Sequence, residues 1–495
     1  MVKHNQSLGI VPIIYGFVLL LGIGFFSPTW AMDSKKPNVI VILADDLGWT
    51  DLGCYGSDLH ETSHLDGLAK SGMRFTQNYS ACTVCSPTRA ALLTGKYPAR
   101  LHITDWIPGA MPENPKLLVP DWQKHLPLEE LTLAEVFQSA GYRTASIGKW
   151  HLGTEEFYPT HQGFDLNIAG SDKPQPPTYF APWKIPTLED GPDGSYLTDR
   201  LADEAVRFIE ANRDAPFFLY LPHFAVHTPI QGRVDLVEKY KGKVRDTLRH
   251  KNPHYAAMVE SLDLAVGKVL TKLEELHLDK NTIVVFTSDN GGLITRGTTT
   301  NQPLRFGKAS AYEGGVRVPL IVRWPGQTKP ASICDAPTIT MDLFPTLVAC
   351  ADLGLPNKLG SSTAAPGCDG ISIVPLLNGS QTRTDRTELF WHYPHHQHYQ
   401  LGGATPYSAI RSGDHKLIEF HNDGHVELYH VRDDIGESKD LAKQQPEIAS
   451  QLLRRLQAWR QEVGAQMPSP NPKYDPSKPE HTPPPVRKNS KNTPS

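Results

Sequence analysis

The sequence has little net charge and no block of basic residues in the part that we expect to fold. Among its 495 residues, 49 Lys and Arg nearly balance 53 Asp and Glu, which leaves a formal net charge of −4. Proteins that bind nucleic acid typically cluster positive charge on one face, so we expect no nucleic acid as a partner. The 42 prolines and 39 glycines, without any internal repeat, favour a loop-rich enzyme over a helical bundle.

Cysteine is also scarce. The six cysteines are too scattered for the dense disulfide framework of small secreted domains, although Cys350 and Cys368 could close a local loop. A CxxC pair occurs once, in CTVCSPTRA at residues 82–90, and a four-cysteine zinc site needs a second such pair. Because no thioredoxin-like context surrounds the pair, its spacing supports neither a zinc site nor a redox pair.

Long apolar runs are absent except near the start, where LGIVPIIYGFVLLLGIGFF follows Lys3 and His4. A positive start, an apolar run and the small residue Ala31 predict a secretory signal over residues 1–31. The alternative is a retained membrane anchor, because the run approaches the length of a span. We therefore expect an exported protein, periplasmic or secreted (lumenal or lysosomal in a eukaryote), with no stable membrane partner.

Apolar runs typical of buried strands alternate with helical patterns through the first two thirds of the chain. The strand patterns are NVIVIL, TASIG, PFFLYL and TIVVFTS, and the helical patterns cover residues 132–141, 197–212 and 255–276. Thr132 and Glu135 form a predicted capping box at the start of the first of these helices. This alternation predicts an α/β fold with a large, mostly parallel sheet between helices.

The pattern changes near residue 385. There KLIEF and HVELY flank Asn422-Asp423-Gly424, which predicts a hairpin, and a helical stripe follows. We therefore expect a catalytic domain over residues 36–384 and a small α+β subdomain with an antiparallel sheet over residues 385–465. Residues 466–495 are rich in Pro, Lys and Ser, a composition that predicts an extended or disordered tail.

Chemically active side chains gather where the predicted strands end. In open α/β sheets, ligands bind at the carboxyl ends of the strands. Two of these ends carry only oxygen donors, which suit a hard divalent cation such as calcium or magnesium, whereas either pair alone is more typical of a helix cap or turn. The oxygen donors are Asp45, Asp46, Asp289 and Asn290, and the other strand ends supply Lys149, His151 and His227.

The stretch around Cys85 predicts the start of a helix. Ser86 and Pro87 suit the cap and first turn of a helix that Gly95 ends. Cys85 then lies at a helix N-terminus, where amide N–H groups favour negative charge, with Arg89 one turn further on. Taken alone, the stretch is also typical of a buried structural cysteine.

CSPTRAALLTG resembles the signature of type I sulfatases, in which the cysteine of C-x-P-x-R is oxidised after translation to formylglycine. The resemblance continues through PNVIVILADDLG, GKWHLG, GFD, HTP, SDNGG and GKASAYEGGVRVPLIVRWPG, in the family's order. It implies an alkaline-phosphatase-like sandwich, sulfuric ester hydrolase activity, one calcium ion and a partner enzyme that generates formylglycine.

The resemblance also implies roles for individual residues. The metal ligands would be Asp45, Asp46, Asp289 and Asn290, with the modified Cys85 beside the metal. The formylglycine oxygens would be held by Arg89 and Lys149, and its second hydroxyl contacted by His151. The sulfate and bridging oxygen would be held by His227 and Lys308, with Ser171 as a further contact on the sulfate side.

The implied mechanism uses the two hydroxyls of an aldehyde hydrate at position 85. One hydroxyl attacks sulfur to form a covalent sulfate ester, while His227, helped by Lys308, protonates the departing alcohol. His151 then takes the proton of the second hydroxyl, the C–O bond to sulfate breaks, and the aldehyde re-forms. Calcium and the neighbouring cationic side chains neutralise the anionic transition state.

Two other functions remain open at this stage. A phosphate or phosphonate monoester hydrolase of the same fold would use a similar inventory of strand-end residues. A non-catalytic glycan-binding sulfatase homologue is the second alternative, although loss of Cys85, His151 or Lys308 would be its signature and all three are present.

A stretch rich in His and aromatic residues, FWHYPHHQHY at residues 390–399, lies where the predicted C-terminal subdomain begins. Aromatic faces stack on sugar rings and imidazoles bond to hydroxyls, so we expect His395 and His396 to bind a sulfated carbohydrate. A metal-binding tract or a solvated loop is the alternative. The expected function is therefore an exo-acting glycan sulfatase, on galactose- or N-acetylgalactosamine-type sugars.

Overall fold

The structure is a computed structural model that describes residues 1–4, 9, 36–354, 368–397 and 405–480. Residues 1–35 form a unit of their own, and the account below concerns the unit that begins at Lys36. Nearly all of the predicted signal segment, residues 1–31, lies outside the described residues. Within the described ranges, no helix combines the length and apolar character needed to cross a membrane.

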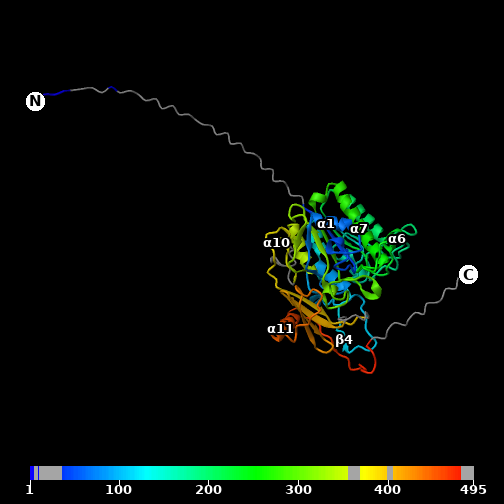
Figure 1. Ribbon diagram of the computed structural model, residues 1–495. Helices are drawn as coiled ribbons and strands as arrows, with labels where there is room; N and C mark the ends of the chain where they lie inside the picture. Colours follow the sequence, from blue (N-terminus) through cyan, green and yellow to red (C-terminus); the bar gives the residue numbers. More distant parts are fainter. Residues whose placement is uncertain (5–8, 10–35, 355–367, 398–404, 481–495) are drawn as a thin grey trace. The chain divides into compact units, whose positions relative to one another are not determined.

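A mixed sheet of eight strands forms the centre of the catalytic part (Figure 1). Five strands from β8 to β6 run parallel, and β9 joins them antiparallel. In spatial order the strands are β10 (Ser332–Cys334), β2 (Met73–Phe75), β9 (Leu320–Arg323), β8 (Thr282–Ser288), β1 (Asn38–Ala44), β7 (Phe217–Pro222), β5 (Arg143–Ile147) and β6 (Leu166–Ile168).

Strand β1 explains why the sheet lies between two layers of helices. Its sequence NVIVILA is apolar at nearly every position, and all seven residues are buried. Alternate side chains of a strand point to opposite faces, so Ile40 and Ile42 enter one core and Val39 and Val41 enter another. The first core packs on α1 (Ser63–Ser71), α5 (Leu197–Ala211) and α7 (Pro253–Glu275); the second packs on α2 (Cys85–Thr94), α4 (Leu133–Ser139), α9 (Leu343–Cys350) and α10 (Val374–Leu377).

Most predicted elements of this part are confirmed, and one boundary is wrong. Helix α4 carries the predicted capping box, in which Thr132 accepts from the Glu135 amide and the Glu135 carboxylate accepts from the Thr132 amide. Helix α2 ends at Gly95 as expected, but it begins at Cys85 rather than after a Ser86 cap. The Ser86 hydroxyl instead donates to the carbonyl of His151, so this side chain ties the helix to the loop that follows β5.

A four-stranded antiparallel sheet forms the C-terminal part, drawn in orange in Figure 1. The predicted hairpin is confirmed, because β14 and β15 pair antiparallel across residues 421–425. The amphipathic helix α11 covers this sheet, and the rings of Phe390 and Trp459 stack with centroids 4.7 Å apart. The elements are β12 (Glu388–Tyr393), β13 (Tyr407–Ser412), β14 (His415–Phe420), β15 (Val426–His430) and α11 (Pro446–Glu462).

The described part of the predicted tail contains a short strand and turns and is hydrogen-bonded to residues 114–118. Strand β16 (Ser469–Pro470) pairs with β4 (Leu117–Leu118), and the Asn114 side chain donates to the Asp475 carbonyl at 2.8 Å. Residues 481–495 lie outside the described residues. The remaining short elements are β3 (Asn78–Tyr79), which pairs with β11 (Thr338–Ile339), and α3 (Pro98–Leu101), α6 (Val234–Lys241) and α8 (Glu313–Val316).

All six cysteines fall in the described ranges, and none forms a disulfide. The loop closure considered for Cys350 and Cys368 is therefore absent. Instead, the Cys368 thiol lies 3.5 Å from the Gly95 carbonyl, beside the end of α2.

Candidate active site

Two parallel strands bring the four oxygen donors together. Strands β1 and β8 pair in register, with Ala44 opposite Ser288. The residues that follow these two positions, Asp45-Asp46 and Asp289-Asn290, therefore leave the same edge of the sheet side by side. The Asp46 amide confirms this closeness, since it donates to the Asp289 carboxylate at 3.2 Å.

A glycine allows Lys149 to reach the same edge. Gly148 follows β5 with a φ of +129°, which glycine adopts far more readily than other residues. A Cβ atom here would lie 2.0 Å from the Pro222 carbonyl oxygen at the end of β7. This close approach of two strand ends places the Lys149 ammonium 2.6 Å from the Asp45 carboxylate.

Arg89 links helix α2 to the strand ends. Its guanidinium donates twice to the Asp289 carboxylate, at 3.0 and 2.8 Å, and once to the Lys149 carbonyl at 2.9 Å. It also lies 3.6 Å from Asp45. Arg89 and its partners are completely buried, so the charges are compensated by one another and not by water.

Lys308 and His227 approach the cluster from the other side and converge on Asp46. The Lys308 ammonium lies 2.7 and 2.9 Å from the two Asp46 oxygens, and His227 Nε2 lies 3.6 Å from one of them. Burial alone would raise the pKa of Asp46, but the Lys308 ammonium, the nearby His227 and the amide of Asn290 lower it to about 2. Asp46 is therefore ionised throughout the physiological range.

The cluster has the properties of a cation site. Asp45 Oδ1 and Asn290 Oδ1 are buried oxygens without a hydrogen-bond partner among the described residues, which is rare unless an ion or water completes the site. Burial and the neighbouring Asp45 raise the pKa of Asp289 to about 6, despite Arg89. A divalent cation would satisfy both oxygens and offset the repulsion between the carboxylates, so the residues present fit such an ion.

Cys85 lies at the head of α2, against Lys308. Its Sγ is 3.5 Å from the Lys308 ammonium, and the residue is only 2% exposed. Burial raises the pKa of the thiol to about 12, although Lys149 and Lys308 oppose this effect. The cysteine is therefore a neutral thiol at pH 7, a poor nucleophile in its unmodified form.

Two histidines border Cys85 with defined tautomers. The His151 Nε2–H donates to the Ile107 carbonyl at 2.5 Å, which leaves the buried Nδ1 as a lone pair without a partner among the described residues. The His227 Nδ1–H donates to the Thr228 carbonyl at 3.0 Å. Burial, reinforced by nearby lysines, lowers the pKa of His151 well below its usual range and that of His227 to about 3.

Four of the six predicted catalytic residues line one cavity of about 340 Å³, and the other two, Arg89 and Lys149, are completely buried beside Asp45 and Asp289. Sequence reasoning missed the remaining lining residues, which come from loops with no periodic pattern in the sequence. Trp106 lies in the loop TDWIPG, and Gln397 lies inside the His-rich stretch. The sequence carries no signal that distinguishes either residue from its neighbours. The cavity is lined by Cys85, His151, His227, Lys308, Trp106, Pro174, Gln175 and Gln397.

The three predicted substrate contacts are not brought to this cavity wall. Ser171 is buried, and its carbonyl accepts a hydrogen bond from the His151 amide at 2.9 Å. His395 and His396 are each 1% exposed; His395 Nε2 lies 2.8 Å from the Thr104 hydroxyl, and His396 Nε2 lies 3.0 Å from the Leu117 carbonyl. These imidazoles face protein groups, and contact of His395 or His396 with a sugar stays a prediction.

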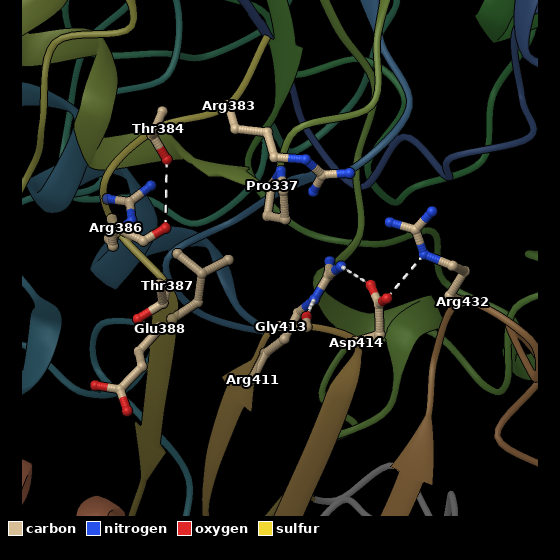
Figure 2. A pocket seen from close by; sticks show the side chains of 11 residues that line it. Pro337, Arg383, Thr384, Arg386, Thr387, Glu388, Arg411, Gly413, Asp414 and Arg432 are labelled. Carbon is tan, nitrogen blue, oxygen red and sulfur yellow. Dashed lines mark hydrogen bonds and ion pairs between the residues drawn. The ribbon is translucent and has the colours of Figure 1, made fainter.

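A second cavity, of about 180 Å³, lies at one end of the C-terminal sheet and is lined by none of the predicted catalytic residues (Figure 2). Figure 2 shows Arg411 and Arg432 turned toward Asp414, with the ion pairs at 3.9 and 2.9 Å. Arg386, which also lines it, pairs with Asp342 at 2.6 Å. Three of the arginines that line it, Arg386, Arg411 and Arg432, are thus paired with carboxylates.

A separate buried cluster of Asp51, His60 and His250 lies behind the strand ends. His250 is held between two carboxylates, with Nδ1 2.6 Å from Asp58 and Nε2 3.2 Å from Asp51. Burial alone would lower the pKa of His250, but these carboxylates raise it above its usual value. The Tyr255 hydroxyl donates to Asp51 at 2.6 Å and lies 3.3 Å from the Asp46 carbonyl, so the cluster packs against the Asp46 loop.

Comparison with known proteins agrees with this site. Residues 37–353 match the family model "Sulfatase", and residues 304–462 match "N-sulphoglucosamine sulphohydrolase, C-terminal". A sulfatase of Formosa agariphila is 35% identical over 86% of this chain and 89% of its own length. Human arylsulfatase A is 33% identical over 87% and 89%. The crystal structure of Ps i-CgsB in complex with k-i-k-neocarrahexaose has a TM-score of 0.72 at 28% identity, over 90% of this chain and 96% of that chain.

The chain belongs to the sulfatase family, and the protein is a sulfuric ester hydrolase. This confirms the family resemblance, the alkaline-phosphatase-like α/β fold and the hydrolase class expected from the sequence. The predicted bounds 36–384 and 385–465 stay a prediction, since the two family matches overlap between residues 304 and 353.

Proposed function

We propose that the protein removes sulfate from a sulfated glycan, through a formylglycine generated from Cys85 and with one calcium ion in the carboxylate cluster. The observation that carries the proposal is the position of Cys85 at a helix head, 3.5 Å from the Lys308 ammonium and in one cavity with His151 and His227. A thiol with a pKa of about 12 cannot act as a thiolate here, which supports its conversion to another nucleophile.

The residues of the chain supply the proton transfers and the charge. His151 is neutral and has a lone pair on Nδ1, which suits a base that takes a hydroxyl proton from residue 85. His227 is neutral without substrate, and the negative charge of a bound sulfate group favours its protonated form. Lys308 adds a fixed positive charge beside it, so the two side chains together suit protonation of the leaving alcohol and stabilisation of the sulfate oxygens.

Asp45, Asp46, Asp289 and Asn290 would hold the calcium ion. All four side chains offer an oxygen atom as a metal ligand. The buried oxygens of Asp45 and Asn290 that lack a hydrogen-bond partner among the described residues support the assignment. When bound, the ion supplies Lewis-acid stabilisation of charge on the sulfate and on residue 85. Arg89 and Lys149 keep the carboxylates oriented, because each bonds to a carboxylate of the cluster as well as lying beside the head of α2.

A carbohydrate substrate is supported by the cavity and by the structural relative. The neocarrahexaose complex is an oligosaccharide complex of a protein that is 28% identical to this chain. A volume of about 340 Å³ is at the small end of ligand pockets, which supports the entry of one terminal sugar and exo action. Galactose- and N-acetylgalactosamine-type sulfates are the first substrates to examine.

The test compares turnover of matched aryl sulfates and phosphates, followed by a panel of sulfated mono- and oligosaccharides. We expect release of sulfate from sugars, with oligosaccharides losing sulfate from one end of the chain only. A higher kcat/KM for the aryl phosphate than for the aryl sulfate would instead favour the phosphate or phosphonate monoester hydrolase. Turnover of neither ester by protein carrying formylglycine would favour the non-catalytic homologue.

We also propose that residues 1–31 direct export, to the periplasm or outside the cell, and that a formylglycine-generating enzyme acts on the chain. The support is the charged start and apolar run of the sequence. Determining the first residue of the mature protein tests export, because cleavage after Ala31 gives a new N-terminus at Met32 whereas a retained anchor does not.

A further inference from the structure

Beyond the four predicted catalytic residues, the described residues that line the active-site cavity are uncharged. Cys85, His151, His227 and Lys308 form one part of the lining, and Trp106, Pro174, Gln175 and Gln397 form the rest. Trp106 offers a half-buried aromatic surface, and the two glutamines offer amides. This lining is suited to a neutral group rich in hydroxyls, attached to the sulfate that the catalytic residues hold.

The amide of Gln397 has a fixed orientation. Its nitrogen donates to the Asp105 carboxylate at 3.2 Å and makes a second, short hydrogen bond to the Tyr393 hydroxyl. The Tyr393 hydroxyl itself donates to the same Asp105 oxygen at 2.7 Å, and the Trp106 amide donates there at 2.8 Å. Because that oxygen is already the acceptor for Tyr393 and Trp106, the nitrogen of the Gln397 amide, and not its oxygen, faces it.

The carbonyl oxygen of Gln397 is left without a partner. The residue is 1% exposed, and Oε1 has no hydrogen bond among the described residues. A buried acceptor without a donor costs free energy, and such groups in native proteins commonly complete a site for a ligand or water. A ligand that supplies a hydroxyl or amide N–H would satisfy it, whereas a carboxylate or second sulfate would be repelled.

A second amide complements this acceptor. Gln175 also lines the cavity, and its carbonyl oxygen accepts a hydrogen bond from the Thr228 hydroxyl at 3.1 Å. That bond directs the amide oxygen to Thr228 and leaves the nitrogen as a donor. Thr228 follows His227 directly, so this donor is tied to a catalytic loop, while Gln397 is tied to the Asp105–Trp106 loop.

We propose that Gln397 is a specificity-determining residue whose carbonyl oxygen accepts a hydrogen bond from a hydroxyl or acetamido N–H of an uncharged sugar unit, with Gln175 as the complementary donor. The proposal rests on the proposed function and adds the substrate class: a sulfated neutral sugar and not a sulfated uronic acid. It also moves recognition within the His-rich stretch from His395 and His396, which do not line the cavity, to Gln397, which does. Asp105 and Tyr393 act as positioning residues, because they hold the amide and do not line the cavity.

The experiment measures kcat/KM of wild type, Gln397→Ala and Gln397→Met on two probes, 4-nitrophenyl sulfate and the sulfated monosaccharide that wild type hydrolyses best. The sugar panel contains 6-sulfates of galactose, N-acetylgalactosamine, glucose and N-acetylglucosamine, with a sulfated uronic acid as the charged competitor. Gln444→Ala, an exposed glutamine of the C-terminal part, is the matched control and should leave both probes unaffected. Thermal unfolding of each variant verifies folding, and Gln397→Met keeps the side chain's length if the alanine variant is unstable.

We expect both Gln397 variants to lose kcat/KM about 10- to 100-fold more on the sugar than on the aryl sulfate, as lost hydrogen bonds to a substrate hydroxyl do. On a deoxy sugar that lacks the recognised hydroxyl, kcat/KM of wild type should fall by the same factor. The variants should show no further fall on this sugar. Equal losses on both probes, no loss on either, preference for the uronic acid, or turnover of the aryl sulfate but no sugar would each overturn the proposal. Failure of wild type on the aryl sulfate as well would instead refute the proposed function.

Discussion

Replacing Asp289 by asparagine should stabilise the protein when divalent cations are removed and destabilise it when they are present. Without a cation, burial and the charge of Asp45 raise the pKa of Asp289 from its ordinary 3.8 to about 6. A carboxylate with a raised folded-state pKa opposes folding once ionised, here by about 3 kcal/mol at pH 7. The cost develops as pH rises from about 4 to about 6, since over that range the folded state binds more protons than the unfolded state.

The asparagine keeps the volume and one acceptor for Arg89 but removes the charge. It also loses the hydrogen bond from the Asp46 amide, which is worth about 1 kcal/mol. The net expectation for cation-free protein is a gain of about 2 kcal/mol at pH 7, which shrinks toward pH 4. With calcium present we expect the wild type to be the more stable protein. Calcium at a hundred times its Kd adds about 2.7 kcal/mol to the free energy of unfolding of the wild type and not to that of the variant.

The assay is denaturant unfolding of both proteins after chelation and after addition of calcium, between pH 4 and 8. Asp335→Asn, at an exposed aspartate, is the control that should respond to neither. The reasoning is wrong if chelation leaves the wild type equally stable, or if cation-free Asp289→Asn is the less stable protein at pH 7.

The remaining predictions concern charge, burial and backbone geometry. Lys308→Met should lower kcat by about 10²–10³ with the fold intact by circular dichroism, because it removes the cation beside residue 85; an unchanged kcat would exclude the role. His250→Gln should cost about 3–5 kcal/mol at pH 6, since it breaks a buried pair with Asp51. This loss of stability should shrink as pH rises. Because the pKa of His250 is raised in the folded protein, its charge stabilises the fold fully below about pH 6.5, the unfolded-state pKa, and stops doing so above the folded-state pKa. A loss of stability that grows with pH would contradict this. Gly148→Ala should unfold or inactivate the protein, since its Cβ would meet the Pro222 carbonyl at 2.0 Å, and a crystal structure with Lys149 undisturbed would refute it.

Much of the fold and of the catalytic cluster is predictable because it depends on local patterns. The run NVIVILA predicts a strand buried on both faces, and the matching ends of β1 and β8 follow from parallel pairing. The sequence alone therefore predicts that Asp45 and Asp289 lie close together, because each follows a strand and the two strands are predicted to be parallel. The capping box of Thr132 and Glu135 is similarly local, since both partners lie within one helical turn.

The side of the site that we propose to bind the sugar was not predictable, for a physical reason. Gln397 differs from His395 and His396 in the hydrogen bonds that its side chain makes. The partners of these three side chains are Asp105 for Gln397, Thr104 for His395 and Leu117 for His396, and they lie about 280 to 290 residues away in the chain. Composition indicates a stretch suited to sugars, but the orientation of each side chain depends on the loop packed against it. The Ser86 assignment failed similarly, because its hydroxyl bonds to His151 and not to its own helix.

The central claim is tested most directly by relating activity to the chemical state of residue 85. The peptide containing residue 85 is quantified by mass in preparations that differ in maturation, and kcat on an aryl sulfate is measured for each. Formylglycine replaces the side chain's sulfur by oxygen and removes two hydrogens, so the two forms are resolved. We predict that kcat rises in proportion to the fraction of formylglycine and vanishes without it. Full activity in protein that carries only unmodified Cys85 would contradict the account.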